Sequence, residues 1–107
     1  MKESEAIKND QEKPNISLIP ADVLFEVAKT FTYGSLKYEK WNYSKGMEYT
    51  RYTSAAMRHI LQALQGEDID EESKCYHLSN AITSLSMCLH NQLTGKIIDD
   101  RNPVYKL

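Results

Sequence analysis

The chain has 107 residues, which is enough for one domain and too few for two well-buried cores. Apolar residues make up 41% and charged residues 26% of it, so it has the composition of a folded globular protein. Its formal net charge of −2 excludes the strongly basic surface with which proteins bind long DNA or RNA regardless of sequence. Long nucleic acid is therefore not an expected partner.

The start of the chain is polar and charged and differs from the rest. We expect a flexible arm over residues 1–15 and a single helical domain over residues 16–107. The short apolar run at residues 16–20 should lie extended on the core and lead into a helix. We see neither a secretory signal nor the roughly 20 apolar residues that a membrane helix needs. These features predict a cytoplasmic protein with no membrane partner.

Apolar residues at three- and four-residue steps predict three main helices and no strands. The first should start near Ala21, break at Gly34 and resume for a turn or two. The second should run from about Glu48 to Gly66, and the third from a cap at Asp70 to about residue 93. The predicted fold class is all-α, a small bundle whose first helix is broken.

The predicted third helix carries a polar stripe beside its apolar one. Among the polar residues, His77 and Asn80 can donate and accept hydrogen bonds in fixed directions, as recognition of a base or phosphate requires. A solvated helix face explains the stripe as well. On the second helix, Arg58 could bind phosphate oxygens. Taken as single residues, Arg58 has the alternative interpretation of a surface cation, and His59 that of a hydrogen-bonded core histidine.

Carboxylates suggest a cation site, although none of them is specific alone. The acidic run that contains Glu67 and Asp70 could hold magnesium, and Glu26 could face it across the bundle. Helix capping and solubility explain the run equally well, and Glu26 could be an ordinary exposed acid. Near the break, Lys37 and Tyr38 could supply a phosphate cation and a stacking surface.

The predicted core is small, and many aromatic side chains between residues 33 and 52 add apolar surface outside it. We therefore expect a homo-oligomer.

An ordered set of short motifs resembles the phage dATP/dGTP diphosphohydrolase family over about residues 10–101. The motifs are Asp10, Lys13-Pro14, Leu18-Ile19-Pro20, Glu26-Val27-Ala28, Gly34, Lys37-Tyr38, Trp41-Asn42, Gly46, Arg58-His59, Gly66-Glu67, Asp70, Ser73, His77-Leu78 and Asp99-Asp100-Arg101. The resemblance implies a fold like that of the all-helical MazG-like nucleotide pyrophosphohydrolases. Those enzymes use magnesium or manganese to release pyrophosphate from nucleoside triphosphates.

From this resemblance we expect a metal-dependent (deoxy)purine nucleoside triphosphate pyrophosphohydrolase that gives a monophosphate and pyrophosphate. Glu26, Glu67 and Asp70 are the expected metal ligands and catalytic carboxylates. The residues expected to bind the nucleotide are Lys37, Tyr38, Trp41, Asn42, Arg58, His59, His77 and Asn80.

The sequence departs from the broader MazG pattern, because two helix-borne acids are missing where that pattern has them. A second hypothesis is therefore a sponge that binds a linear or cyclic nucleotide signal of host immunity, without metal and without cleaving it. A purely structural interaction module is a third.

Overall fold

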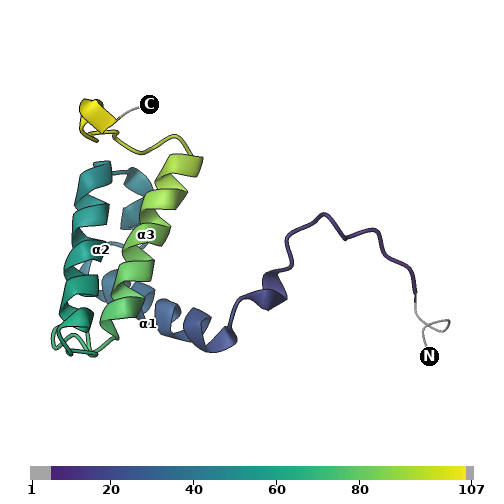
Figure 1. Ribbon diagram of the computed structural model, residues 1–107, viewed down its shortest axis with the longest axis horizontal. Helices are drawn as coiled ribbons and strands as arrows, with labels where there is room; N and C mark the ends of the chain where they lie inside the picture. The colour runs from purple at the N-terminus through teal and green to yellow at the C-terminus, as the bar shows by residue number, and fades with distance from the viewer. Residues whose placement is uncertain (1–5, 106–107) are drawn as a thin grey trace.

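The computed structural model describes residues 6–105, which contain three α-helices (Figure 1). They are α1 (Ala21–Lys37), α2 (Tyr49–Leu64) and α3 (His77–Leu93). Three short 3₁₀ helices, η2 (Ile16–Leu18), η3 (Asn42–Lys45) and η4 (Pro103–Tyr105), lie in the connections and the tail. Extended pairing in the described part is limited to isolated bridges, so the predicted all-α class is confirmed. No helix among these residues is both long and apolar enough to span a membrane.

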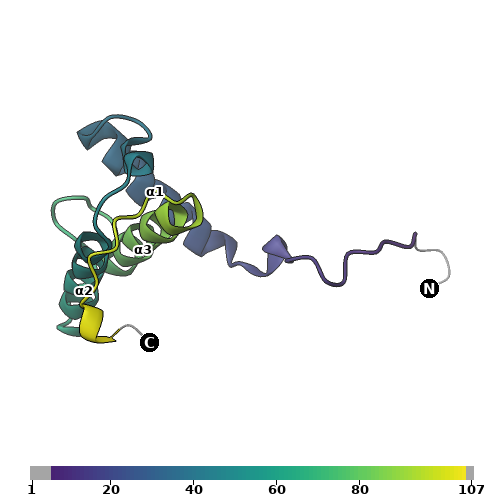
Figure 2. The same cartoon turned by 90° about the horizontal axis from the view of Figure 1, so that it is seen from above.

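The helices α2 and α3 form an antiparallel pair, and α1 packs across α3 on one side of that pair (Figures 1 and 2). The segment before α1 runs away from the helices. Its described residues 6–15 are all exposed, and residues 1–5 of the predicted arm lie outside the described part. Whether this arm is flexible stays a prediction.

Two predictions about helix ends were wrong. The helix α1 continues through Gly34 to Lys37 instead of breaking, because a glycine lowers helix stability by only about 1 kcal/mol and contacts beyond it hold the last turn in place. The helix α3 begins at His77, seven residues after the predicted cap. Asp70 instead closes a turn, in which its carboxylate accepts hydrogen bonds from the amide and hydroxyl of Ser73.

The prediction for residues 16–20 was also wrong. Ile16 and Leu18 are 72% and 79% exposed, so this apolar run does not lie on the core. It forms a 3₁₀ turn because the Asn15 side chain accepts a hydrogen bond from the Ser17 amide and caps it.

About half of the buried residues of the bundle are polar, and the apolar stripe of α3 is largely exposed, which departs from the usual amphipathic arrangement. The side of α3 that faces α1 and α2 carries the buried residues His77, Ser79, Asn80, Thr83, Ser84 and Asn91. The aliphatic side of α3 carries Leu78, Ile82, Leu85 and Leu89, each between 41% and 57% exposed, and its first two residues border α1. The polar stripe of α3 is thus neither a solvated face nor an open recognition surface. It is the packing surface of the single chain.

Asn91 joins the helices where α3 nears its end. Its side chain is fully buried, and its amide nitrogen lies 2.8–2.9 Å from the Tyr52 hydroxyl and the carbonyl oxygens of Tyr43 and Met87. These hydrogen bonds connect α3 to α2 and to η3.

The segment after α3 returns to the start of α2. The Tyr49 amide donates to the Ile98 carbonyl at 2.8 Å, and the Asp100 carboxylate accepts hydrogen bonds from the amide and hydroxyl of Thr50. Asp100 therefore satisfies a donor at the N-terminus of α2, as a local cap would. Gly46, just before α2, adopts φ +89°, and a Cβ there would lie 2.3 Å from the Lys96 carbonyl oxygen.

Candidate functional site

Polar side chains from every helix meet at one end of the bundle, around the connection between α2 and α3. We call this group the polar cluster. Its members are Thr30, Tyr33 and Lys37 of α1, His59 of α2, Glu67, Asp70, Glu72 and Ser73 of the connection, and His77, Ser79 and Asn80 of α3.

Asp70 organises the connection. One of its oxygens accepts hydrogen bonds from the Ser73 hydroxyl at 2.7 Å and the Ser73 amide at 3.1 Å. The Asn80 amide also reaches this oxygen at 3.3 Å and the Ser73 hydroxyl at 3.0 Å. Burial alone would raise the pKa of Asp70, but the hydrogen bonds from Ser73 outweigh it and lower the pKa. Asp70 is therefore a carboxylate at neutral pH.

The last turn of α1 contacts this connection through a charged pair. The Lys37 ammonium donates to the Glu72 carboxylate at 2.7 Å, and the Tyr33 hydroxyl donates to the same oxygen at 3.0 Å. The hydrogen bond between Lys37 and Glu72 is the main cause of both pKa shifts: it lowers the pKa of Glu72 and raises the pKa of Lys37. Both groups stay charged, and the exposed ammonium keeps two further donors for an anion.

Two histidines of the polar cluster lie in contact. The Nδ1 atoms of His59 and His77 are 2.9 Å apart, so one must donate and the other accept. His77 is fully buried, and its Nε2 has no hydrogen-bond partner among the described residues but lies 3.6 Å from the Glu67 carboxylate. That negative charge favours a proton on His77 Nε2, which leaves Nδ1 to accept from His59. The lone pair that the contact between the two histidines does not use then lies on Nε2 of His59.

His59 is in the neutral form that such a lone pair requires. Burial, with a smaller contribution from the nearby His77, lowers the pKa of His59. The carboxylates of Asp70 and Glu72 act in the opposite direction, which places them within electrostatic reach of the ring. A neutral histidine among carboxylates can accept a proton from water or a hydroxyl group.

Hydroxyl groups connect α1 to α3 beside this pair. The Thr30 hydroxyl lies 2.7 Å from that of Ser79 and 3.0 Å from the Asn80 carbonyl oxygen. The Ser79 hydroxyl also donates to the backbone carbonyl of Glu26 at 2.7 Å. Glu26 thus contacts α3 through its backbone, while its carboxylate pairs with Lys29 at 2.9 Å.

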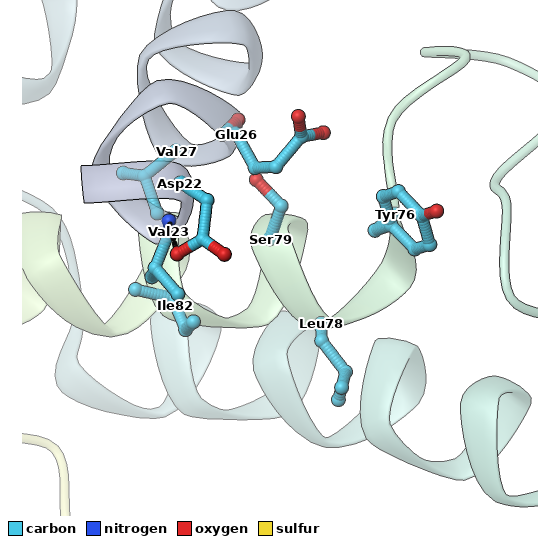
Figure 3. Close-up of a pocket in the computed structure, with 8 residues that line it drawn as sticks. All are labelled: Asp22, Val23, Glu26, Val27, Tyr76, Leu78, Ser79 and Ile82. Atoms are coloured by element: carbon cyan, nitrogen blue, oxygen red, sulfur yellow. Dashed lines mark hydrogen bonds between the residues drawn. The ribbon is translucent and has the colours of Figure 1, made fainter. Parts of the chain in front are cut away.

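Glu26 lines a separate groove between α1 and α3, with a volume of about 260 Å³ (Figure 3). Apart from the carboxyl groups of Asp22 and Glu26, this groove is bordered mainly by apolar side chains, among them Val23, Leu78 and Ile82. It lacks the converging polar donors that a phosphate needs.

The three predicted metal ligands do not converge within one chain. In the described part, no three His, Cys, Asp or Glu side chains are placed to hold a metal ion together. Asp70 binds Ser73, Glu67 lies beside His77, and Glu26 lines the groove. Because these residues do not fit a metal site, we assign no step of a reaction to one.

The eight residues predicted to bind the nucleotide are spread over several parts of the structure. His59, His77, Asn80 and Lys37 belong to the polar cluster. Tyr38 and Trp41 are 57% and 61% exposed beyond the end of α1, with Asn42 at the start of η3. Arg58 is exposed on α2, where its guanidinium donates to the Ser54 hydroxyl at 3.1 Å.

The sequence reasoning missed Tyr33, Thr30 and Ser79, and it named Glu72 only as part of the acidic run. Tyr33 and Lys37 are four residues apart, which places them on one face of a helix. A helix assumed to break at Gly34 hides that relation. The contacts of Thr30 with Ser79 join residues 49 apart and have no local signal.

Comparisons with known proteins agree on one family. The model of the family described as dATP/dGTP diphosphohydrolase, N-terminal, matches residues 3–101. A protein named dATP/dGTP diphosphohydrolase from Salmonella phage PMBT28 is 34% identical over 98 residues, which cover 89% of this chain and 32% of that protein. The chain thus spans about a third of the length of this relative. No solved structure matches it significantly.

Proposed function

This chain belongs to the dATP/dGTP diphosphohydrolase, N-terminal, family, and from that premise we propose that it binds a purine (deoxy)nucleoside triphosphate and cleaves it. In this reaction a water oxygen attacks the α-phosphorus, and the bond from the α-phosphorus to the bridging oxygen of the β-phosphate breaks. Pyrophosphate leaves and a nucleoside monophosphate remains.

The observation that carries this proposal is the histidine pair backed by a carboxylate. Glu67 favours the His77 tautomer that accepts a hydrogen bond from His59, and the lowered pKa of His59 keeps its Nε2 unprotonated at neutral pH. In our proposal His59 takes the proton of the attacking water. His77 and Glu67 act as positioning residues.

Phosphate binding falls to the cationic side chains near the polar cluster. Lys37 already lies against Glu72 and retains donors, and Arg58 is one residue from His59. The carboxylates of the polar cluster repel a triphosphate, which is consistent with the predicted need for magnesium or manganese as a counter-cation. The comparison of reactions with and without magnesium or manganese, described below, tests that need.

The test is incubation of the pure protein with a panel of nucleoside triphosphates, with and without magnesium or manganese, followed by chromatography. Wild type should produce monophosphate and pyrophosphate. His59→Gln should reduce turnover by about 100-fold or more, because 100-fold is the lower end of what general acid–base catalysis usually contributes. His90→Gln changes an exposed histidine near the far end of α3 and serves as the matched control. Equal rates in both variants would overturn the role of His59.

A positioning role for Glu67 has a readout of its own. Glu67→Gln should keep nucleotide binding and lower the turnover rate, with a shift of the acidic limb of the pH profile. A change in binding with an unshifted profile would contradict it.

The dispersed carboxylates favour a second candidate, a sponge that holds a nucleotide without cleaving it. The same incubation decides between the two when the panel includes cyclic dinucleotides. Metal-independent retention of a ligand that is released intact on denaturation would establish the sponge and exclude the enzyme.

A further inference from the structure

The polar cluster contains three carboxylates and one ammonium group. The carboxylates are those of Glu67, Asp70 and Glu72, and the ammonium is that of Lys37. Carboxylate oxygens are the ligands that magnesium prefers, and neighbouring carboxylates repel one another unless a cation lies beside them. The position of the ammonium in this group therefore decides how strongly the group attracts a metal ion.

Lys37 binds Glu72 where the last turn of α1 meets the connection between α2 and α3. Its ammonium lies 2.7 Å from one oxygen of the Glu72 carboxylate, and the Tyr33 hydroxyl donates to the same oxygen at 3.0 Å. Tyr33 and Lys37 are four residues apart and so lie on the same face of the helix. This oxygen of Glu72 is thus already bound by a cation and by a second donor.

Two further features hold the ammonium beside the carboxylates. Lys37 is the basic residue in the last turn of α1, where the partial negative charge of the helix C-terminus favours a cation. The ammonium also lies 5.5 Å from the centre of the Tyr38 ring, within the range of a cation–π contact. Together with the contact to Glu72, these features keep the side chain of Lys37 in place although it is 44% exposed.

Asp70 adds a second negative charge beside Glu72. The charge of Asp70 works against the lowered pKa of Glu72, so the two carboxylates are within electrostatic reach of each other. The groups of Ser73 and Asn80 that donate to Asp70 are neutral. Within the polar cluster, Lys37 therefore supplies the formal positive charge that balances this pair of carboxylates.

We propose that Lys37 is the built-in counter-cation of the polar cluster and takes the place beside Glu72 and Asp70 that a divalent ion would otherwise fill. Because an ammonium repels such an ion, the protein without nucleotide should bind magnesium or manganese weakly. The inference deepens the proposed function and rests on it in one respect. An ion that the reaction requires would enter on the phosphates of the nucleotide, to which magnesium commonly binds.

The test is a titration of the pure protein with Mn²⁺ in the absence of nucleotide, in which the loss of the electron paramagnetic resonance signal of free Mn²⁺ measures the bound ion. Lys37→Met removes the charge and keeps a long apolar side chain. Relative to wild type, this variant should bind Mn²⁺ roughly tenfold more tightly or better, because Glu72 and Asp70 then face the ion without the ammonium.

Lys45→Met is the matched control. Lys45 pairs with Glu39 at 2.8 Å, nearly the same distance as in the pair of Lys37 with Glu72, and both members are exposed. The pKa of Glu39 is shifted by Lys45 and by burial, without a contribution from another carboxylate. The substitution thus releases a single carboxylate, which should leave Mn²⁺ binding close to that of wild type.

Three results would overturn the proposal. They are Mn²⁺ binding to wild type as tight as to Lys37→Met, the same gain in Lys45→Met, and a gain in Lys37→Arg, which keeps the positive charge. Adding Glu72→Gln to Lys37→Met should cancel the gain, and a gain that persists would refute the place of Glu72. Lys37→Gln, with another good helix former, covers the case in which Lys37→Met fails to fold by circular dichroism.

Because this titration contains no nucleotide, its failure differs from a failure of the proposed function. Calorimetry with the uncleavable α,β-methylene analogue of dATP, at a fixed magnesium concentration, measures nucleotide binding separately. Binding of the analogue together with tight Mn²⁺ binding to nucleotide-free wild type would overturn the role of Lys37 and leave the proposed function in place. Failure to bind or cleave any nucleotide would overturn the proposed function, whereas a gain in Lys37→Met would still support the counter-cation.

Discussion

Replacing Asn91 by alanine should destabilise the protein strongly, although the substitution is far from the polar cluster. The Asn91 amide group has two N–H donors and lies within 2.9 Å of three acceptors, so it makes the equivalent of two good hydrogen bonds. Each contributes about 1 kcal/mol, and the Tyr43 carbonyl loses a buried partner, so we expect a loss of about 2–3 kcal/mol. For a domain of this size that corresponds to a fall in melting temperature of roughly 10–20 °C.

Thermal and urea denaturation at a fixed protein concentration would measure this loss. Gln92→Ala is the control, since Gln92 is the exposed neighbour on the same helix and should change stability by less than about 0.5 kcal/mol. A loss below about 1 kcal/mol for Asn91→Ala would refute the reasoning, because it would mean that the buried amide contributes no more than a single surface hydrogen bond.

Asn91→Asp sharpens the test, because it has nearly the same shape. Its carboxylate would face two carbonyl oxygens and could accept only from the Tyr52 hydroxyl. At neutral pH this variant should be less stable than Asn91→Ala. Burial raises the pKa of such a carboxyl, so the folded state binds the extra proton and the deficit should shrink as the pH falls. A deficit that is independent of pH would contradict this account.

Further predictions concern the backbone, His59 and the cap of α2. Gly46→Ala should lower the free energy of unfolding by about 3 kcal/mol, because left-handed strain adds to the clash with a carbonyl oxygen. Gly66, at φ +101°, has open space around it, so Gly66→Ala should lower it by only about 1–2 kcal/mol. Equal losses in urea denaturation would contradict the clash. Because the pKa of His59 is lowered in the folded state, the unfolded chain binds more protons than the folded chain below pH 6.5. Acidification from neutral pH should therefore destabilise wild type more than His59→Gln. Stability curves that run parallel with pH would contradict this prediction. Asp100→Asn should lower the melting temperature at neutral pH, and the difference from wild type should vanish as the pH falls through the lowered pKa of Asp100; an unchanged melting temperature at neutral pH would show that Asp100 does not cap α2.

The sequence predicts the helices better than their packing. The periodicity of α2 and the glycine after it placed that helix within a residue or two, because both signals are local. The start of α3 could not be found in this way, because Asp70 is a good cap residue by type but its turn is closed by Ser73 and its carboxylate is also reached by Asn80.

The side of α3 that is buried could not be predicted from the sequence either. The pattern shows an aliphatic side and a polar side, and the usual rule turns the aliphatic side inward. In this chain small polar residues such as Ser79 and Thr83 face the neighbouring helices instead. The usual rule does not hold for α3, in which Leu85 and Leu89 are about half exposed.

The candidate site was predicted in part. The residue types of His77 and Asn80 pointed to directed hydrogen bonding, and the structure brings both into one group with Asp70. The contact of His59 with His77 depends on the pairing of α2 with α3, which no local pattern encodes. The predicted convergence of Glu26 with the other carboxylates assumed that α1 presents it to the connection, whereas it lines the groove.

The polar interior has a thermodynamic consequence for the melting behaviour of the protein. In the described part the buried apolar residues are only Tyr52, Ala56, Cys75, Ala81 and Cys88. Since exposure of apolar surface produces the heat-capacity increase of unfolding, a single chain should show less than the about 1.2–1.5 kcal/mol/K that is usual for 100 residues. Its unfolding would then be broad and weakly cooperative. The sharpness of a calorimetric melting curve thus reports how much apolar surface the folded protein buries in solution.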